Sequence, residues 1–152
     1  MAPKKQATER FKFRAWIKPD NPLQSYSGMY DVIALEQKTC VVKRASLFAQ
    51  HIFPLDCVEI MQWTGLTDRH GKEIYEGDIV KRSEGYNGDC FEPEWKCIVE
   101  WDDGGFALMR PRGAFIATLD SCEVFNMDIE VIGNVYENSN LLKEPTNEEK
   151  TG

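Results

Sequence analysis

Three acidic residues stand close together near position 100 and could take part in metal chemistry. Glu100, Asp102 and Asp103 offer three carboxylates within four positions. Such a group can hold a divalent cation that activates water, which makes a metal-dependent hydrolase one alternative function. The segment reads WDDGGF, however, and aspartates next to glycines are favoured in tight turns for backbone reasons alone. We therefore expect Asp102 and Asp103 to form a hairpin turn.

A second possible chemistry is acid–base catalysis by His70, which follows Asp68 closely and has a side chain that titrates near neutral pH. No nucleophile motif accompanies it. The neighbouring glycines and Lys72 resemble part of a phosphate-binding loop, but no hydroxyl residue follows the lysine and the chain runs into strand-like sequence. We predict neither catalysis nor nucleotide binding here, and we expect His51 to be a half-buried packing residue.

The cysteines do not form a metal-binding pattern. Structural zinc sites usually take Cys or His ligands in pairs two to four residues apart. The chain has five cysteines at irregular spacings, and the two closest are Cys90 and Cys97. We predict no metal and no cofactor, and we expect reduced thiols in a cytosolic protein.

Basic and aromatic residues alternate near the start of the chain, in RFKFRAW. This arrangement resembles surfaces that bind single-stranded nucleic acid, where rings stack on bases and cations follow the phosphates. Residues 1–18 carry a local charge of +5, although the whole chain has a net charge of −7. Nucleic-acid binding therefore stays an alternative function, with these candidate contacts: Lys12, Arg14, Trp16, Lys81 and Arg82.

The composition predicts a soluble globular protein. Hydrophobic residues make up 42% of the 152 residues, and no apolar run approaches the roughly 20 residues needed to span a bilayer. The first residues lack the apolar segment of a secretory signal, so we expect a cytoplasmic protein. We predict a flexible basic arm over residues 1–10, one domain over 11–142 and a flexible tail over 143–152. The domain could consist of two lobes, about 11–60 and 61–142.

The spacing of apolar residues predicts a mainly β fold. Phe11, Phe13, Ala15 and Ile17 alternate with polar or larger residues, which is the period of a half-buried strand. We expect one or two short helices, one over residues 46–53 and helical turns within 117–127, in a strongly bent antiparallel sheet or an SH3-like barrel. About eight strands are predicted, over residues 11–17, 30–35, 39–44, 56–63, 79–82, 95–101, 106–110 and 128–138, and a further strand edge is expected to start at residue 74.

Two closely spaced corners mark the stretch TGLTDRHGKEIYEGDIVKRS, residues 64–83. The first contains Asp68 and Gly71, and the second is Glu76-Gly77-Asp78. Glycine supplies the positive φ that such turns need, and aspartate accepts nearby backbone N–H groups. We interpret the following as positions of backbone geometry: Gly65, Gly71, Gly77, Asp78, Gly133 and Asn134.

Several segments together resemble the YopX family of small phage and prophage proteins. They are FKFRAW, MYDV, IMQWTGLTDRHGKEIYEGDIVK, VEWDDGGFAL and EVIGNVYENSNLL, which occur in this order and cover most of residues 11–142. The resemblance implies a β-rich fold with small helical additions and a phage or prophage origin. It implies no catalytic residues, because the activity of the family is uncharacterised.

The function expected from these observations is binding rather than catalysis. We predict an accessory protein that binds a host or phage protein in the bacterial cytoplasm. We expect it to be a homo-oligomer and not to act at a membrane. Tryptophan and tyrosine are enriched at the energetic centres of interfaces. The candidate interface residues are therefore the large aromatics Tyr30, Trp63, Tyr75, Trp95 and Trp101.

Overall fold

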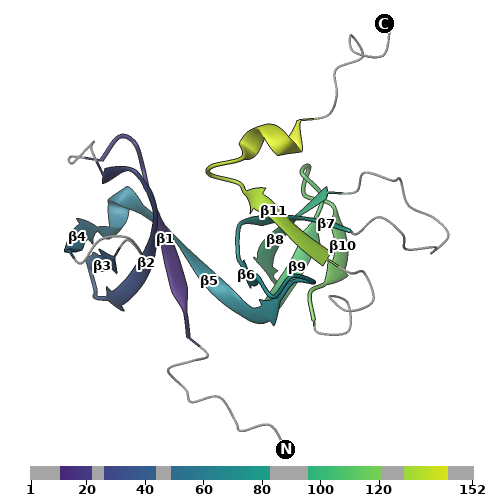
Figure 1. The fold of residues 1–152 in the computed structure, drawn as a ribbon, viewed down its shortest axis with the longest axis horizontal. Coiled ribbons are helices and arrows are strands. Elements are labelled where there is room, and N and C mark those ends of the chain that lie inside the picture. Colours follow the sequence, from purple (N-terminus) through teal and green to yellow (C-terminus); the bar gives the residue numbers. More distant parts are fainter. Residues whose placement is uncertain (1–10, 22–25, 44–48, 83–95, 121–128, 144–152) are drawn as a thin grey trace, which may run out of the picture. The chain divides into compact units, whose positions relative to one another are not determined.

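A computed structural model of the chain describes residues 11–21, 26–43, 49–82, 96–120 and 129–143. These residues form two antiparallel sheets with short 3-10 helices (Figure 1), so the predicted mainly β class is confirmed. The strand order is β4-β3-β2-β1-β5-β6 in one sheet and β10-β9-β8-β7-β11 in the other. Over the described residues neither sheet closes into a barrel. The chain divides into two compact units, Met1–Gly65 and Leu66–Gly152.

The first unit is built on five strands around one hydrophobic core. The strands are β1 (Phe13–Ile17), β2 (Gly28–Leu35), β3 (Thr39–Lys43), β4 (Gln50–Pro54) and β5 (Val58–Thr67), with the 3-10 helix η2 (Leu55–Cys57) before β5. β5 continues past Gly65 into the second unit. The buried core consists of Ala15, Ile17, Tyr30, Cys40, Val42, Phe53 and Val58.

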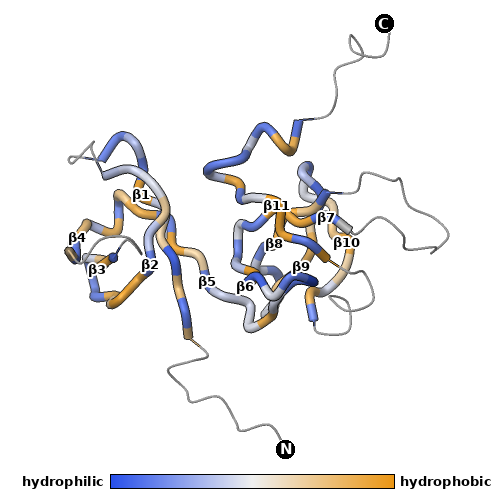
Figure 2. Tube along the Cα trace, viewed as in Figure 1, coloured by the Kyte–Doolittle hydropathy of each residue, from blue (hydrophilic) through white to orange (hydrophobic). Residues whose placement is uncertain are grey.

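The second unit contains the remaining strands and a second core. The elements are β6 (Glu73–Tyr75), β7 (Asp78–Arg82), β8 (Lys96–Asp102), β9 (Gly105–Met109), β10 (Phe115–Thr118), β11 (Ile129–Asn134) and the 3-10 helix η3 (Ser139–Leu142). The buried core consists of Ile74, Val80, Cys97, Val99, Leu108, Leu119, Ile129 and Val131. Figure 2 shows hydrophobic residues concentrated along the strands of both units.

Local sequence accounts for most of these strands. In β1 the buried positions Ala15 and Ile17 are two residues apart, because successive side chains of a strand point to opposite faces. The predicted hairpin between β8 and β9 is present, and its two turn residues, Asp103 and Gly104, have φ values of 45° and 86°. Tight hairpins require positive φ at these two positions, which explains the Asp-Gly pair.

The helix predicted over residues 46–53 is wrong over its described part, because Gln50–Pro54 forms strand β4. Phe53 is buried and Ile52 is exposed, which is the alternation of a strand, and β3 provides the pairing partner. Strand β10 was not predicted, and it replaces the helical start expected at residues 117 and 118. The remaining helical prediction over 121–127, the basic arm and the tail from residue 144 lie outside the described residues.

No helix in the described part of the chain combines the length and the apolar character needed to cross a membrane.

Candidate functional site

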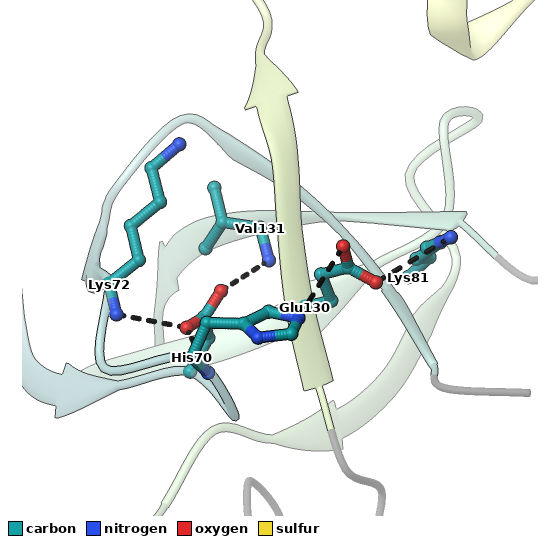
Figure 3. Close-up of polar contacts among 6 residues, drawn as sticks. His70, Lys72, Lys81, Glu130 and Val131 are labelled. Atoms are coloured by element: carbon teal, nitrogen blue, oxygen red, sulfur yellow. Dashed lines mark hydrogen bonds and ion pairs between the residues drawn. The ribbon is translucent and has the colours of Figure 1, made fainter.

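A buried carboxylate joins the first turn of residues 64–83 to a distant strand. Asp68 is 6% exposed. Its Oδ1 accepts the backbone N–H groups of His70 and Lys72 at 2.8 and 2.9 Å, and its Oδ2 accepts the N–H of Val131 at 2.9 Å (Figure 3). Val131 belongs to β11, 63 positions away. We call this arrangement the Asp68 clamp, because it fastens the turn between β5 and β6 to β11.

The environment of the Asp68 clamp favours the ionised carboxylate. Burial alone acts to raise the pKa of Asp68, but the backbone N–H groups of Val131, Lys72 and His70 outweigh burial and hold the pKa below its usual value. Both carboxylate oxygens accept these backbone bonds, so Asp68 orients the main chain of His70 and not its imidazole. Asp68 and His70 are therefore close, as expected, but their hydrogen bond stabilises the turn and does not orient the imidazole for catalysis.

The His70 ring points toward a different carboxylate. Its Nε2 lies 3.7 Å from Oε1 of Glu130, and Nζ of Lys81 lies 3.6 Å from Oε2 of the same residue (Figure 3). Both separations are longer than a hydrogen bond, and the His70 side chain is 60% exposed. Surface ion pairs of this length contribute little to the stability of the fold, and they do not hold the His70 ring in one position for proton transfer.

The second corner is also organised by backbone contacts. Oδ2 of Asp78 accepts the N–H of Tyr75 at 2.8 Å, and the Asp78 side chain is buried. Gly77 has a φ of 80°, donates its N–H to the carbonyl of Val99 at 2.7 Å and accepts the N–H of Val135 at 2.9 Å. These bonds connect the corner to β8 and to the end of β11.

The end of β11 forms a third turn around Asn134. Its Oδ1 accepts the N–H groups of Tyr136 and Glu137 at 3.0 and 2.9 Å, and its own N–H donates to Oδ1 of Asn138 at 3.1 Å. A Cβ added to Gly133 would lie 2.5 Å from Oδ1 of Asn138. Glycine is required at 133 because the Asn138 side chain occupies that space.

The three carboxylates near position 100 are not gathered into a site. Glu100 and Asp102 lie on β8 and Asp103 lies in the hairpin turn, all exposed to solvent. Among the described residues, no group of three or more His, Cys, Asp or Glu side chains is arranged to hold a metal ion. The hydrolase alternative thus lacks an assembled ligand set in this part of the chain.

Two of the described cysteines, Cys40 and Cys97, are in surroundings that disfavour the reactive thiolate. Cys40 and Cys97 are buried and free, and Cys57 is partly exposed and free. Burial raises the pKa of the Cys97 thiol to about 12 and also raises the pKa of Cys40. Both thiols are therefore protonated at neutral pH, and the thiolate is the reactive form.

The candidate nucleic-acid contacts are distributed over both units of the chain. Nζ of Lys12 lies 4.7 Å from the centroid of the Trp63 ring, in a cation–π contact. Arg14 and Trp16 are half-buried on β1, whereas Lys81 lies in the second unit beside Glu130. The side chain of Arg82 is outside the described part.

The aromatic candidates for an interface separate into buried and exposed residues. The candidate interface residues Tyr30 and Trp63 are buried. Tyr30 belongs to the core of the first unit, where its ring centroid lies 6.5 Å from that of Phe53. Tyr75 is half-buried and donates its hydroxyl to Oε2 of Glu73 at 2.9 Å. Trp95 lies outside the described residues.

Trp101 is the exposed member of this group. Its side chain is 54% exposed near the tip of the β8–β9 hairpin. The ring of Phe106, directly opposite on β9, meets the Trp101 ring edge to face, with centroids 5.0 Å apart and an interplanar angle of 84°. Phe106 in turn packs against the core of the second unit. Trp101 is therefore an exposed ring with a fixed support.

The sequence indicates that Asp68 is a turn residue, but it does not indicate the bond between Asp68 and Val131. The composition of the turn indicated that an aspartate would accept the N–H groups of His70 and Lys72. Nothing in the sequence pattern connects position 68 with position 131, because that contact depends on the pairing of β7 with β11. Asn138, which fills the space at Gly133, was also missed, although this contact is local and lies within the turn that follows β11.

The fold and these turns define a mainly β protein with two sheets and short 3-10 helices. The family model described as YopX protein matches residues 12–143, and the chain belongs to this family. The crystal structure of protein EF1440 from Enterococcus faecalis is similar in fold. It has 24% sequence identity and a TM-score of 0.57, and the match covers 88% of this chain and 98% of that chain. The search of curated proteins found no match.

Proposed function

We propose that this chain is a non-catalytic protein-binding module, a phage or prophage accessory protein that binds a host or phage protein in the bacterial cytoplasm. The observation that carries the proposal is the exposure of Trp101 on a supported hairpin. Buried carboxylates at the turns serve the main chain, which leaves this hairpin as the part of the described surface best suited to recognition.

The contact between Trp101 and Phe106 favours binding in two ways. An exposed indole offers a large apolar area to a partner, and tryptophan is enriched among residues that dominate binding energy. The edge-to-face contact with Phe106 restricts the ring before a partner arrives. Less side-chain entropy is then lost on association, so more of the contact energy remains as affinity.

The charges around Trp101 suggest the chemistry of the partner. Glu100, Asp102 and Asp103 are exposed within two positions of the indole, and residues 73–103 contain ten acids and three bases. A partner surface with Lys or Arg side chains would be attracted to this hairpin, and an arginine can also stack on an indole.

The proposal is tested by capturing partners on the full-length chain, followed by mass spectrometry and titration of the purified partner. Host cells and infected cells both supply lysate, and nuclease treatment removes partners held through nucleic acid. The Trp101→Ala variant should lose the partner and raise the dissociation constant by at least about tenfold, as expected for a residue worth more than about 1.4 kcal/mol. The Phe11→Ala variant is a matched control, because Phe11 is also an exposed aromatic, at 62%.

Two results would contradict the proposal. One is a partner that binds the Trp101→Ala variant and the wild type equally. The other is the absence of any nuclease-resistant partner from both lysates.

A further inference from the structure

The outer strands of the two sheets differ in how well they are protected against pairing with another chain. Edge strands usually carry charges, bulges or prolines that prevent such pairing. Among the described end strands, β6 contains Glu73, β11 contains Glu130, and β10 has a register shift between Phe115 and Ala117. Strand β4, QHIFP, contains no Asp, Glu, Lys or Arg and pairs with β3 in unbroken register. Its one protecting residue is Pro54, which stands at the end of the strand. Strand β4 lies at the end of its sheet (Figure 1).

The hydrogen bonding of β4 shows which backbone groups face outward. The N–H of Leu55 donates to the carbonyl of Lys38 at 3.0 Å, immediately after the pair formed by Thr39 and Pro54. In an antiparallel ladder, hydrogen-bonded and non-hydrogen-bonded pairs alternate. The backbone groups of His51 and Phe53 therefore face β3, and those of Gln50, Ile52 and Pro54 face away from the sheet.

We propose that β4 pairs antiparallel with β4 of a second copy of this chain, about a two-fold axis at Ile52. Ile52 is the central residue of the five in β4, so the pairing is self-complementary, as a two-fold interface requires. Ile52 of each copy donates its N–H to the carbonyl of Ile52 in the other. Gln50 of each copy donates to the carbonyl of Pro54 in the other, and the missing N–H of proline costs one bond at each end.

The side chains next to this edge support the same pairing. Ile52 is 64% exposed and lies opposite Val41, which lies opposite Ala34. Ile33, at the register shift of β2, is 47% exposed. Paired residues share one face of a sheet, so joining two copies at Ile52 extends an apolar row from one copy to the other.

No formal charge on β4 itself opposes the pairing, because the strand contains no Asp, Glu, Lys or Arg. Residues 1–65 contain nine basic residues (Lys and Arg) and six acidic residues (Asp and Glu), which gives a net charge of +3. Residues 66–152 contain nine basic and nineteen acidic residues, which gives a net charge of −10. The negative charge that opposes association of the whole chain therefore belongs to the second unit, and β4 belongs to the first. Because the contact depends on backbone bonds and apolar side chains, added salt should not dissociate the pair.

The test is sedimentation equilibrium of the full-length chain over a range of concentrations. The wild type should approach twice the 17.5 kDa mass of the chain. Ile52→Lys places a charge at the centre of the edge, and Ile52→Pro removes the outward N–H without removing a bond to β3. Both variants should sediment at the mass of one chain, with far-ultraviolet circular dichroism unchanged. The use of two variants covers the case in which one of them fails to fold.

The Ile33→Lys variant is the matched control, because it adds the same charge to the same face two strands from the edge. It should remain paired, and the Ile52 amide of the wild type should exchange with deuterium more slowly as protein concentration rises. The inference is overturned if the wild type sediments as a single chain at every concentration. It is also overturned if both Ile52 variants stay paired or if Ile33→Lys dissociates equally. None of these results involves Trp101, so they are distinguishable from failure of the proposed function.

Discussion

At the scale of single residues, the buried polar groups of this protein serve its turns. Asp68, Asp78 and Asn134 are all buried, and each side chain accepts at least one backbone N–H group. A buried polar group without a partner is costly, so such residues remain only where the main chain supplies the partner. The hydrogen bonds that these three side chains accept from the main chain therefore account for their burial.

Asp68→Asn tests the Asp68 clamp. The amide can keep one oxygen for the N–H groups of His70 and Lys72, but its NH₂ group then faces the N–H of Val131, and two donors cannot bond. Leaving a buried N–H unsatisfied costs about 1–3 kcal/mol, and we expect the free energy of unfolding to fall by that amount at neutral pH. Urea denaturation measures it. An unchanged midpoint and slope would contradict this role of Asp68.

The same carboxylate predicts how stability depends on pH. The folded-state pKa of Asp68 is lowered from the ordinary value of 3.8, so its contribution is fully present above that value and is lost as pH falls through the lower, folded pKa. The difference in unfolding free energy between wild type and Asp68→Asn should therefore shrink below about pH 4. Urea titrations at several acidic pH values give this difference. A gap that stays constant into strong acid would show that ionisation of Asp68 is irrelevant.

Gly133→Ala tests the close approach of Asn138. The added methyl group would lie 2.5 Å from Oδ1 of Asn138, which must move and lose the N–H of Asn134. We expect a loss of about 1–3 kcal/mol in the free energy of unfolding, as for other overpacked sites. Gly105→Ala is the control, because nothing lies within 4 Å of a Cβ at that position. Equal thermal stability of the two variants would refute the packing argument.

At the scale of elements, the sequence was sufficient where an element depends on its own pattern. Alternation placed β1, and the Asp-Gly turn placed the β8–β9 hairpin. The pattern failed at β4, because the apolar residues of 46–53 are compatible with either a short helix or a strand and only pairing with β3 decides between them. The burial of Tyr30 and Trp63 also depends on tertiary packing, so residue type alone could not separate them from the exposed Trp101.

Phe53 packs β4 against the core of the first unit. Truncating its side chain should show how much this packing contributes to the free energy of unfolding. The side chain is fully buried in the core with Cys40, which lies opposite on β3. Phe53→Ala should lower the free energy of unfolding by about 3–5 kcal/mol, because it removes buried apolar area and leaves a cavity. Ile33→Ala, at an exposed position of the same sheet, should change it by less than about 0.5 kcal/mol. Guanidinium denaturation measures the free energy of unfolding of both variants. A small effect of Phe53→Ala would show that Phe53 is not the residue that holds β4 to the first unit.

At the scale of the whole molecule, charge is divided unequally between the two units. The net charge of −7 is the sum of +3 over residues 1–65 and −10 over residues 66–152. The partner that we propose for the acidic hairpin with Trp101 is a basic protein surface, and the partner that we propose for β4 is the same strand of a second copy. Phosphate backbones would be repelled by most of the chain and attracted by its first residues.

This division predicts the behaviour of the chain toward nucleic acid. We expect single-stranded DNA to bind only at low salt, through Lys4, Lys5 and Arg10. For three neutralised phosphates, the logarithm of the affinity should fall against that of salt concentration with a slope of about −2. Replacing these three residues by glutamine should abolish binding measured by fluorescence anisotropy. Lys12→Gln should have little effect, because the Lys12 ammonium already lies over Trp63. Salt-resistant binding that requires Lys12 and Trp16 would instead favour a true nucleic-acid surface, since stacking of bases on aromatic rings is less sensitive to salt than phosphate contacts.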